Sequence, residues 1–162
     1  MKVVVTDING VFKNGYDVAA LLELKEQQRA DTGIGGFSVD QEDNIFFTIP
    51  VFFRAYKLAP DRQISDFGRK GSGPGRFSVI AGIVSDDQGY IYVADKLKCV
   101  VMIFDKNFTF QNEFGYRGLR PGRLIVPTNL EMDASGRLYV TQMRKRGARA
   151  ILGTTWAATR KG

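Results

Sequence analysis

Three aspartates recur at almost equal spacing, and they are the side chains here whose type and position could do chemistry. Asp40, Asp86 and Asp133 are 46 and 47 residues apart. Carboxylates act as general acids, as general bases and as ligands of hard cations. A side chain that recurs once in every unit of a repeat is more often scaffold, and each of these precedes turn residues. We therefore expect the three aspartates to cap turns.

Other side chains that carry catalysis or bind metals are scarce. The chain has no histidine and a single cysteine, Cys99. Zinc sites of the usual Cys/His kind, Ser-His-Asp triads and Cys-His pairs therefore cannot form within it. The glycine-rich run at 71–75 lacks the Gly-Lys-Ser/Thr ending of a phosphate-binding loop. We expect no catalytic residue, no metal and no cofactor in this chain. We therefore predict that the chain is not an enzyme, while a longer parent protein could still be one.

The elements that must position these residues form a repeat. One five-residue pattern, rich in β-branched and aromatic residues, occurs four times, at residues 3–7, 45–49, 91–95 and 138–142. Two copies are followed by an aromatic strand, a polar turn, an acidic-Phe-Gly triplet and a glycine-rich connection. Each unit thus predicts four short strands. Four-stranded sheets that repeat every forty-odd residues are typical of the blades of a β-propeller.

One segment has a local preference that conflicts with the repeat. Residues 17–26 begin with Asp17, a good N-cap residue, and continue with strong helix formers. Their place in the repeat nevertheless matches residues 109–115, a fourth strand. Tertiary context routinely overrides helix propensity, so we predict a strand at 17–26.

At this level of detail the sequence resembles the NHL-repeat family of six-bladed β-propellers. The resemblance covers about residues 1–145 and is carried by residues 89–95, 102–105 and 113–115 and by the Gly/Pro/Arg connections. Lys98-Cys99-Val100 stands where that family has its Asn-His-Leu triplet. The resemblance implies a binding domain, since some NHL propellers bind RNA and many bind proteins.

We predict an all-β chain that forms an incomplete β-propeller of four-stranded antiparallel blades. It opens on a second strand and holds about three blades, with 13 strands in all. The predicted propeller segment spans residues 1–145 and is followed by an irregular tail, outside the repeat, at 146–162. Within the propeller segment, the predicted blade remnants are 1–32, 33–77, 78–124 and 125–145. A six-bladed ring needs more than this, so the chain is either a piece of a larger propeller or one of two chains that join head to tail.

The charges separate onto two faces of such a disc, because successive antiparallel strands send their loops to alternate faces. The loops after first and third strands carry mostly acidic residues. The loops after second and fourth strands carry eleven basic residues: Arg69, Lys70, Arg76, Lys96, Lys98, Arg117, Arg120, Arg123, Arg144, Lys145 and Arg146. The formal net charge of +6 understates this separation. The alternative to a binding face is a solvated charged rim.

The basic face leads to a predicted function, a non-enzymatic binding or scaffold module whose partner is an acidic protein surface or another polyanion. RNA is the first alternative, with Tyr116 as a stacking surface for a base. The second alternative is part of a propeller hydrolase or lyase whose catalytic residues lie outside this chain. No apolar stretch is long enough for a transmembrane helix and no signal peptide is visible. The sequence leaves the compartment unknown.

Overall fold

The structure, a computed structural model, describes residues 1–143. The tail predicted at 146–162 lies outside these residues. Twelve strands occur in the described part, together with two short helices and one 3-10 turn at Pro50–Phe52. The helices are α1 (Val18–Leu21) and α2 (Glu26–Asp31), and the strands are β1 (Lys2–Thr6), β2 (Phe12–Asp17), β3 (Phe37–Val39), β4 (Ile45–Ile49), β5 (Arg54–Leu58), β6 (Ile64–Phe67), β7 (Ile80–Ser85), β8 (Ile91–Asp95), β9 (Val100–Phe104), β10 (Phe110–Gly115), β11 (Pro127–Met132) and β12 (Leu138–Gln142).

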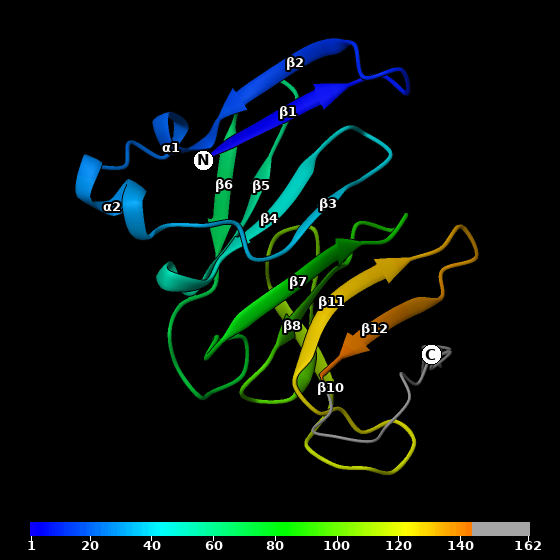
Figure 1. The fold of residues 1–162 in the computed structure, drawn as a ribbon. Coiled ribbons are helices and arrows are strands. Elements are labelled where there is room, and N and C mark those ends of the chain that lie inside the picture. Colours follow the sequence, from blue (N-terminus) through cyan, green and yellow to red (C-terminus); the bar gives the residue numbers. More distant parts are fainter. Residues whose placement is uncertain (144–162) are drawn as a thin grey trace.

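These strands form four separate antiparallel sheets, each a simple meander. The sheets are β1-β2, β3-β4-β5-β6, β7-β8-β9-β10 and β11-β12. They follow one another in sequence order, and Figure 1 shows β1-β2 and β11-β12 at the two ends of the row. The predicted fold class, an all-β propeller with four-stranded antiparallel blades and an incomplete set of them, is confirmed.

Three hydrophobic cores fill the spaces between the four sheets. Successive residues of a strand point to opposite faces of its sheet, so alternate residues of β4 belong to two different cores. Ile45, Phe47 and Ile49 pack with Val3 and Tyr16 of the first sheet. The residue between them, Phe46, packs instead with β8 and β9 of the next sheet. A third core joins the sheet β7–β10 to β11-β12. Each complete blade is therefore apolar on both faces.

Neighbouring blades approach most closely at their first strands. A Cβ atom added to Gly82 would lie 2.7 Å from the Cα of Asn129 and 2.7 Å from the backbone N of Leu130. Gly36, one repeat earlier, would place its Cβ 2.3 Å from the carbonyl oxygen of Ala81. Only glycine leaves room for this backbone-to-backbone packing.

The repeated aspartates cap turns, as expected. Each accepts backbone N–H bonds on Oδ1 from the residues two and four positions further on, as Asp86 does from Gln88 at 3.0 Å and Tyr90 at 2.8 Å. Asp40 and Asp133 make the same pair of bonds. So do Asp7 and Asp105, so the structure uses this turn five times among its described residues.

The place of the first hairpin in the repeat differs from the prediction. Val3 pairs with Tyr16, and Val101 pairs with Phe114 across the third and fourth strands of a complete blade. Both pairs face the following sheet, in the cores described above. Turns with the same aspartate bonds, at Asp7 and Asp105, connect the two strands in each case. β1 is therefore a third strand and β2 a fourth strand, and the prediction that β1 is a second strand is wrong.

The strand predicted at 17–26 is also wrong, and this accounts for twelve strands where thirteen were expected. The segment contains α1, whose N-cap Asp17 accepts a 3.1 Å bond from the backbone N–H of Ala20. Val18 and Ala19 are buried. Since β2 already supplies the fourth strand, this segment belongs to the connection between blades. No sheet competes for its backbone there, so its helix propensity decides.

Candidate functional site

Within residues 1–143, the predicted basic residues lie on turns between second and third strands and on connections between blades. Two contacts show that these turns and connections meet on one face. The ammonium of Lys98 donates to the carbonyl oxygens of Gly73 at 2.9 Å and Arg76 at 2.8 Å. The ammonium of Lys70 lies 5.0 Å from the centre of the Phe53 ring, which ends the turn between β4 and β5.

Two of the connections, 69–77 and 116–124, have the same backbone structure, and we call them the basic loops. In the first, Phe77 N–H donates to Arg69 at 2.8 Å and Gly71 N–H donates to Phe77 at 2.9 Å. In the second, Leu124 N–H donates to Tyr116 at 3.1 Å and Gly118 N–H donates to Leu124 at 3.4 Å. Each loop thus closes on itself and presents its charges at an equivalent place on consecutive blades.

Most of the charges on these loops are exposed and have no carboxylate partner. The exposed cations are Arg69, Lys70, Arg76, Arg117, Arg120 and Arg123. The ion pairs within residues 1–143 are Lys13–Asp7, Arg54–Asp66 and Arg137–Asp133, none of which involves a basic loop.

The remaining members of the predicted face differ in their surroundings. Lys96 and Lys98 are half-buried. Tyr116 is 48% exposed, with the guanidinium of Arg123 5.9 Å from its ring centre. Arg144, Lys145 and Arg146 lie outside the described residues. One exposed aromatic ring offers little surface for stacking bases.

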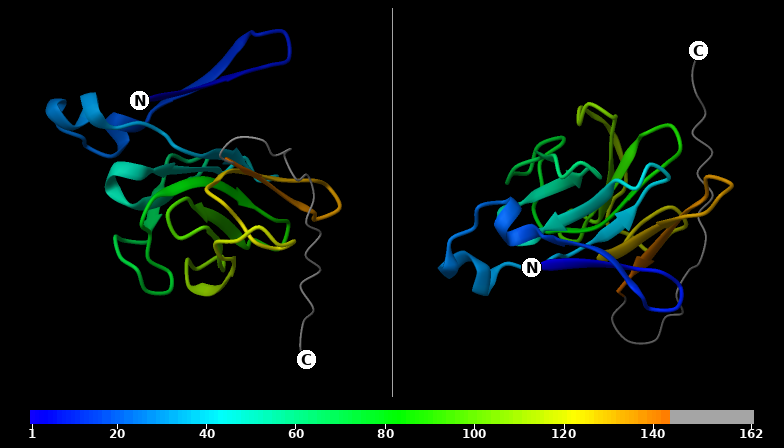
Figure 2. Two further views of the ribbon diagram at one scale, coloured as in Figure 1. Left: turned by 60° about the horizontal axis from the view of Figure 1, so that its bottom comes forward. Right: turned by 90° about the horizontal axis from the view of Figure 1, so that it is seen from above.

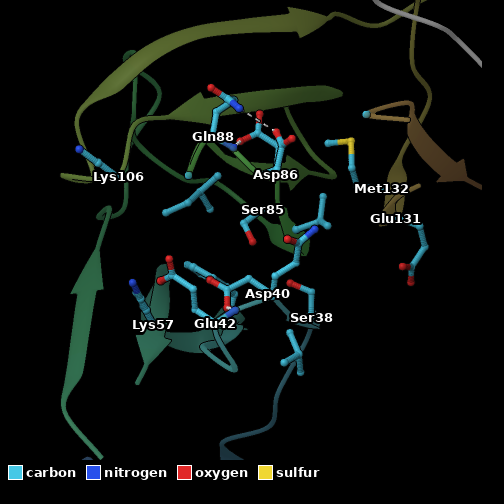
Figure 3. A pocket seen from close by; sticks show the side chains of 18 of the residues that line it. Ser38, Asp40, Glu42, Lys57, Ser85, Asp86, Gln88, Lys106, Glu131 and Met132 are labelled. Atoms are coloured by element: carbon cyan, nitrogen blue, oxygen red, sulfur yellow. Dashed lines mark hydrogen bonds between the residues drawn. The ribbon is translucent and has the colours of Figure 1, made fainter. Parts of the chain in front are cut away.

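The opposite face is hollowed by a pocket of about 760 Å³. Turns after first strands of three sheets line it, together with Lys106 and Phe108 from the turn between β9 and β10 (Figure 3). Lys57 on β5 and Lys106 both lie at the left of the pocket in Figure 3, with Lys106 above Lys57. The carboxylates in the lining are Asp40, Glu42, Asp86, Asp87, Glu131 and Asp133. Six acidic residues against two lysines make this pocket negatively charged.

One turn aspartate of the pocket, Asp133, is held as a fixed charge. The backbone N–H and guanidinium of Arg137, with the hydroxyls of Ser135 and Tyr139, hold the pKa of Asp133 well below its ordinary value. Burial, and then the charge of Asp86 and a 3.0 Å hydrogen bond to it, raise the pKa of Tyr92. Since Asp133 stays ionised, it is poorly suited to shuttle protons near neutral pH. No group of three or more His, Cys, Asp or Glu side chains within residues 1–143 could hold a metal ion.

Sequence reasoning placed acidic turns on this face but did not find the pocket. Ser38, Glu131 and Met132 line it from the ends of β3 and β11, and Lys57 lines it from β5. Their spacing in the sequence carries no signal, because only the packing of three sheets brings them together. The sequence offered one hint. Ser38, Glu131 and Met132 come shortly before a repeated aspartate, and Lys57 lies on the strand that pairs with the strand after Asp40.

Comparison with solved structures now places this architecture. The chain superimposes on virginiamycin B lyase from Staphylococcus aureus with a TM-score of 0.58 and 12% identity, covering 87% of this chain and 42% of the lyase. A streptogramin B lyase structure gives a TM-score of 0.55 and 17% identity, with 82% and 38% coverage. The fold is that of a β-propeller.

A third structure is a catalytically inactive histidine-to-alanine variant of the Staphylococcus aureus lyase with quinupristin. It gives a TM-score of 0.52 and 14% identity, with 82% of this chain and 43% of that chain covered. This propeller chain thus spans about two fifths of the length of these lyases. No protein-family model matches it, and no curated protein matches it in sequence.

These neighbours correct the prediction that the chain is not an enzyme. The structures that the propeller resembles include lyases, so its fold is one that carries catalysis, and the absence of internal catalytic groups does not place it among non-enzymes. At 12–17% identity the similarity shows the fold alone. Within residues 1–143, no helix is long and apolar enough to cross a membrane.

Proposed function

We propose that this chain is an NHL-like propeller segment that binds a polyanionic partner, an acidic protein surface, through the basic loops. One observation carries the proposal: the two loops present six exposed cations at equivalent places on neighbouring blades, and no ion pair within residues 1–143 neutralises any of them. Like charges gathered on one face raise the local potential and attract an extended anion. The acidic opposite face orients the approach of that partner.

The shape of the basic face favours an acidic polypeptide over RNA. Recognition of single-stranded RNA relies on several aromatic side chains that stack on successive bases. Tyr116 is the exposed aromatic on the basic loops, and Arg123 already lies over its ring. Carboxylates, by contrast, need only guanidinium and ammonium groups.

The test measures binding of two labelled probes, polyglutamate and oligouridylate, by fluorescence anisotropy at increasing salt. We expect polyglutamate to bind, with an affinity that falls as salt screens the charges. The double variant Arg117→Glu/Arg120→Glu should weaken binding by about tenfold or more. Lys57→Glu/Lys106→Glu, which changes the net charge equally on the pocket side, serves as the matched control.

The outcomes separate the alternatives. Equal effects of the two double variants would show that net charge, and not this face, attracts the probe. Tighter binding of oligouridylate would replace the acidic protein with RNA. Failure of both probes to bind at low salt would remove the proposal.

A second candidate function is part of a propeller lyase or hydrolase, and the pocket on the acidic face favours it. The cavity of about 760 Å³ is large enough for a small molecule. This chain has no histidine, whereas a histidine-to-alanine variant of the neighbouring lyase is inactive. Such a reaction would therefore need a histidine from outside the chain. Since that histidine would lie outside the chain, the test measures binding of quinupristin to the chain, by equilibrium dialysis, and not cleavage. Binding that Asp86→Asn weakens would support this candidate, and no binding would remove it for this chain.

A further inference from the structure

The two half-blades at the ends of the row are complementary. β1 and β2 have the register of a third and a fourth strand, as shown by the pairs Val3–Tyr16 and Val101–Phe114. β11 and β12 have the register of a first and a second strand, because Met132 pairs with Leu138 as Ser85 pairs with Ile91 in the complete blade. One half-blade therefore holds the two inner strands of a blade, and the other holds the two outer strands.

Each half-blade leaves a strand edge unpaired. Within the described residues, β1 pairs only with β2, and β12 pairs only with β11. In the complete blades the corresponding strands, second and third, pair with each other over five residues. An unpaired edge presents backbone N–H and C=O groups as a template for another strand.

Apolar side chains are exposed where a complete blade buries them. Val4 on β1 is 62% exposed, whereas its counterparts on third strands, Tyr56 and Met102, are 5% and 0% exposed. Phe37 on β3 is 42% exposed, whereas its counterparts Ile83 and Leu130 are both 0% exposed. All these counterparts face the preceding blade. Val4 and Phe37 thus face the side on which this chain provides no further sheet within its described residues.

Phe12 follows the same rule. It pairs with Thr6 as Phe110 pairs with Phe104, so it is a fourth-strand residue that faces the preceding blade. Phe110 is half-buried against the first of the complete blades, but Phe12 is 64% exposed. Figure 2 shows the hairpin β1-β2 projecting away from the other sheets.

We propose that two copies of this chain close a single ring, with β12 of each copy pairing antiparallel with β1 of the other. β11-β12 of one copy and β1-β2 of the other then form one four-stranded blade. The twelve strands within residues 1–143 are the content of three blades, so the described parts of two copies supply six blades. The contact is head to tail, and its two-fold axis runs through the centre of the ring.

A second copy fits as the occupant because it supplies what each open end lacks. Its β11-β12 sheet has the two inner strands that β1-β2 is missing, and its complete blade β7–β10 presents the apolar face that Val4 and Phe12 would cover. Phe37 on β3 would face β11 of that copy, as β7 packs on β3 within this chain. An unrelated partner would have to match both the register and this apolar pattern.

The proposed junction has a defined register. In the complete blades Val93 pairs with Met102, and Phe47 pairs with Tyr56. The corresponding residues at the junction are Val140 of one copy and Val4 of the other. Directly opposed residues of antiparallel strands have Cα atoms roughly 4.5–5.5 Å apart, which is a separation that a disulfide can span.

The first test measures the mass of the full chain in solution by light scattering over a range of concentrations. We expect twice the chain mass of 18.1 kDa. Val4→Asp should raise the dissociation constant about 100-fold or more, because it would place an unpaired charge in the junction. Ile8→Asp is the matched control, since Ile8 is 98% exposed at the tip of the same hairpin and outside the junction.

The second test joins the junction covalently. Val4→Cys/Val140→Cys should give, on mild oxidation, a disulfide-linked species of twice the chain mass, while Val4→Cys/Thr128→Cys should give little. Folding of every variant is checked by far-UV circular dichroism. A folded chain that stays monomeric, a mass of three or more copies, or equal cross-linking of both cysteine pairs would overturn the proposal.

Discussion

The hydroxyl of Thr48 donates a 2.7 Å hydrogen bond to the carbonyl oxygen of Ala81, which joins one blade to the next. The hydroxyl oxygen of Thr48 also accepts a 2.8 Å bond from the backbone N–H of Gly36. Thr48 is fully buried, so no water competes for these groups. A single side chain thus satisfies two backbone groups from first strands of neighbouring blades.

Replacing Thr48 with valine keeps the shape but removes both bonds. The N–H of Gly36 and the carbonyl of Ala81 would stay buried without this partner, and we expect the free energy of unfolding to fall by about 1–3 kcal/mol. Urea denaturation at one fixed chain concentration measures it. Thr109→Val, at an exposed threonine, is the control. An equal loss in the two variants would contradict a role for the bond between blades.

A methyl group at Gly82 should separate the last two sheets. Its Cβ would lie 2.7 Å from backbone atoms of Asn129 and Leu130, which cannot rotate away as a flexible side chain would. We expect Gly82→Ala to cost about 1–3 kcal/mol in the free energy of unfolding. At Gly33 an added Cβ meets nothing within 4 Å, so Gly33→Ala is the control. A neutral Gly82→Ala would show that the blades are packed less closely than described.

Asp133 should make the stability depend on acid pH. Its pKa is held below the ordinary 3.8 by bonds from Arg137, Ser135 and Tyr139, so the folded state favours the ionised form. This contribution to stability is full above about pH 4 to 5 and is lost as the pH falls through the lower pKa of the folded state. The difference in urea midpoint between the wild type and Asp133→Asn should therefore be largest at pH 7 and shrink toward pH 2. A difference that does not change with pH would contradict this account.

Lys98 should hold the first basic loop closed. Its ammonium donates to Gly73 and Arg76, and loss of these bonds should make local opening of the loop easier by about 1 kcal/mol, or about fivefold. We expect trypsin to cleave Lys98→Ala after Arg76 about fivefold faster than the wild type, with the fragments identified by mass spectrometry. Lys96→Ala serves as the control, because its side chain makes neither bond. Equal cleavage rates in both variants would show that Lys98 does not hold the loop.

The sequence alone determined the repeat, most strands and the aspartate turns. These features are local: an Asp86-type turn is closed by bonds to residues two and four positions away, and the strands follow from β-branched and aromatic residues in alternation. The separation of acidic from basic loops is likewise expected once strands alternate in direction. Local chemistry of this kind is visible in a single sequence.

Only the tertiary structure decided what the first hairpin is. Residues 3–7 read like a second strand, but the pairing of Val3 with Tyr16 and their packing on the next sheet make β1 a third strand. That assignment moved the following segment into a connection between blades, where Asp17 starts a helix. It also replaced the thirteen expected strands with twelve, two of which form a half-blade at each end of the described residues. The pocket arose in the same way, since its lining comes from three sheets. Strands of one repeat look alike locally, and long-range packing alone assigns each its place.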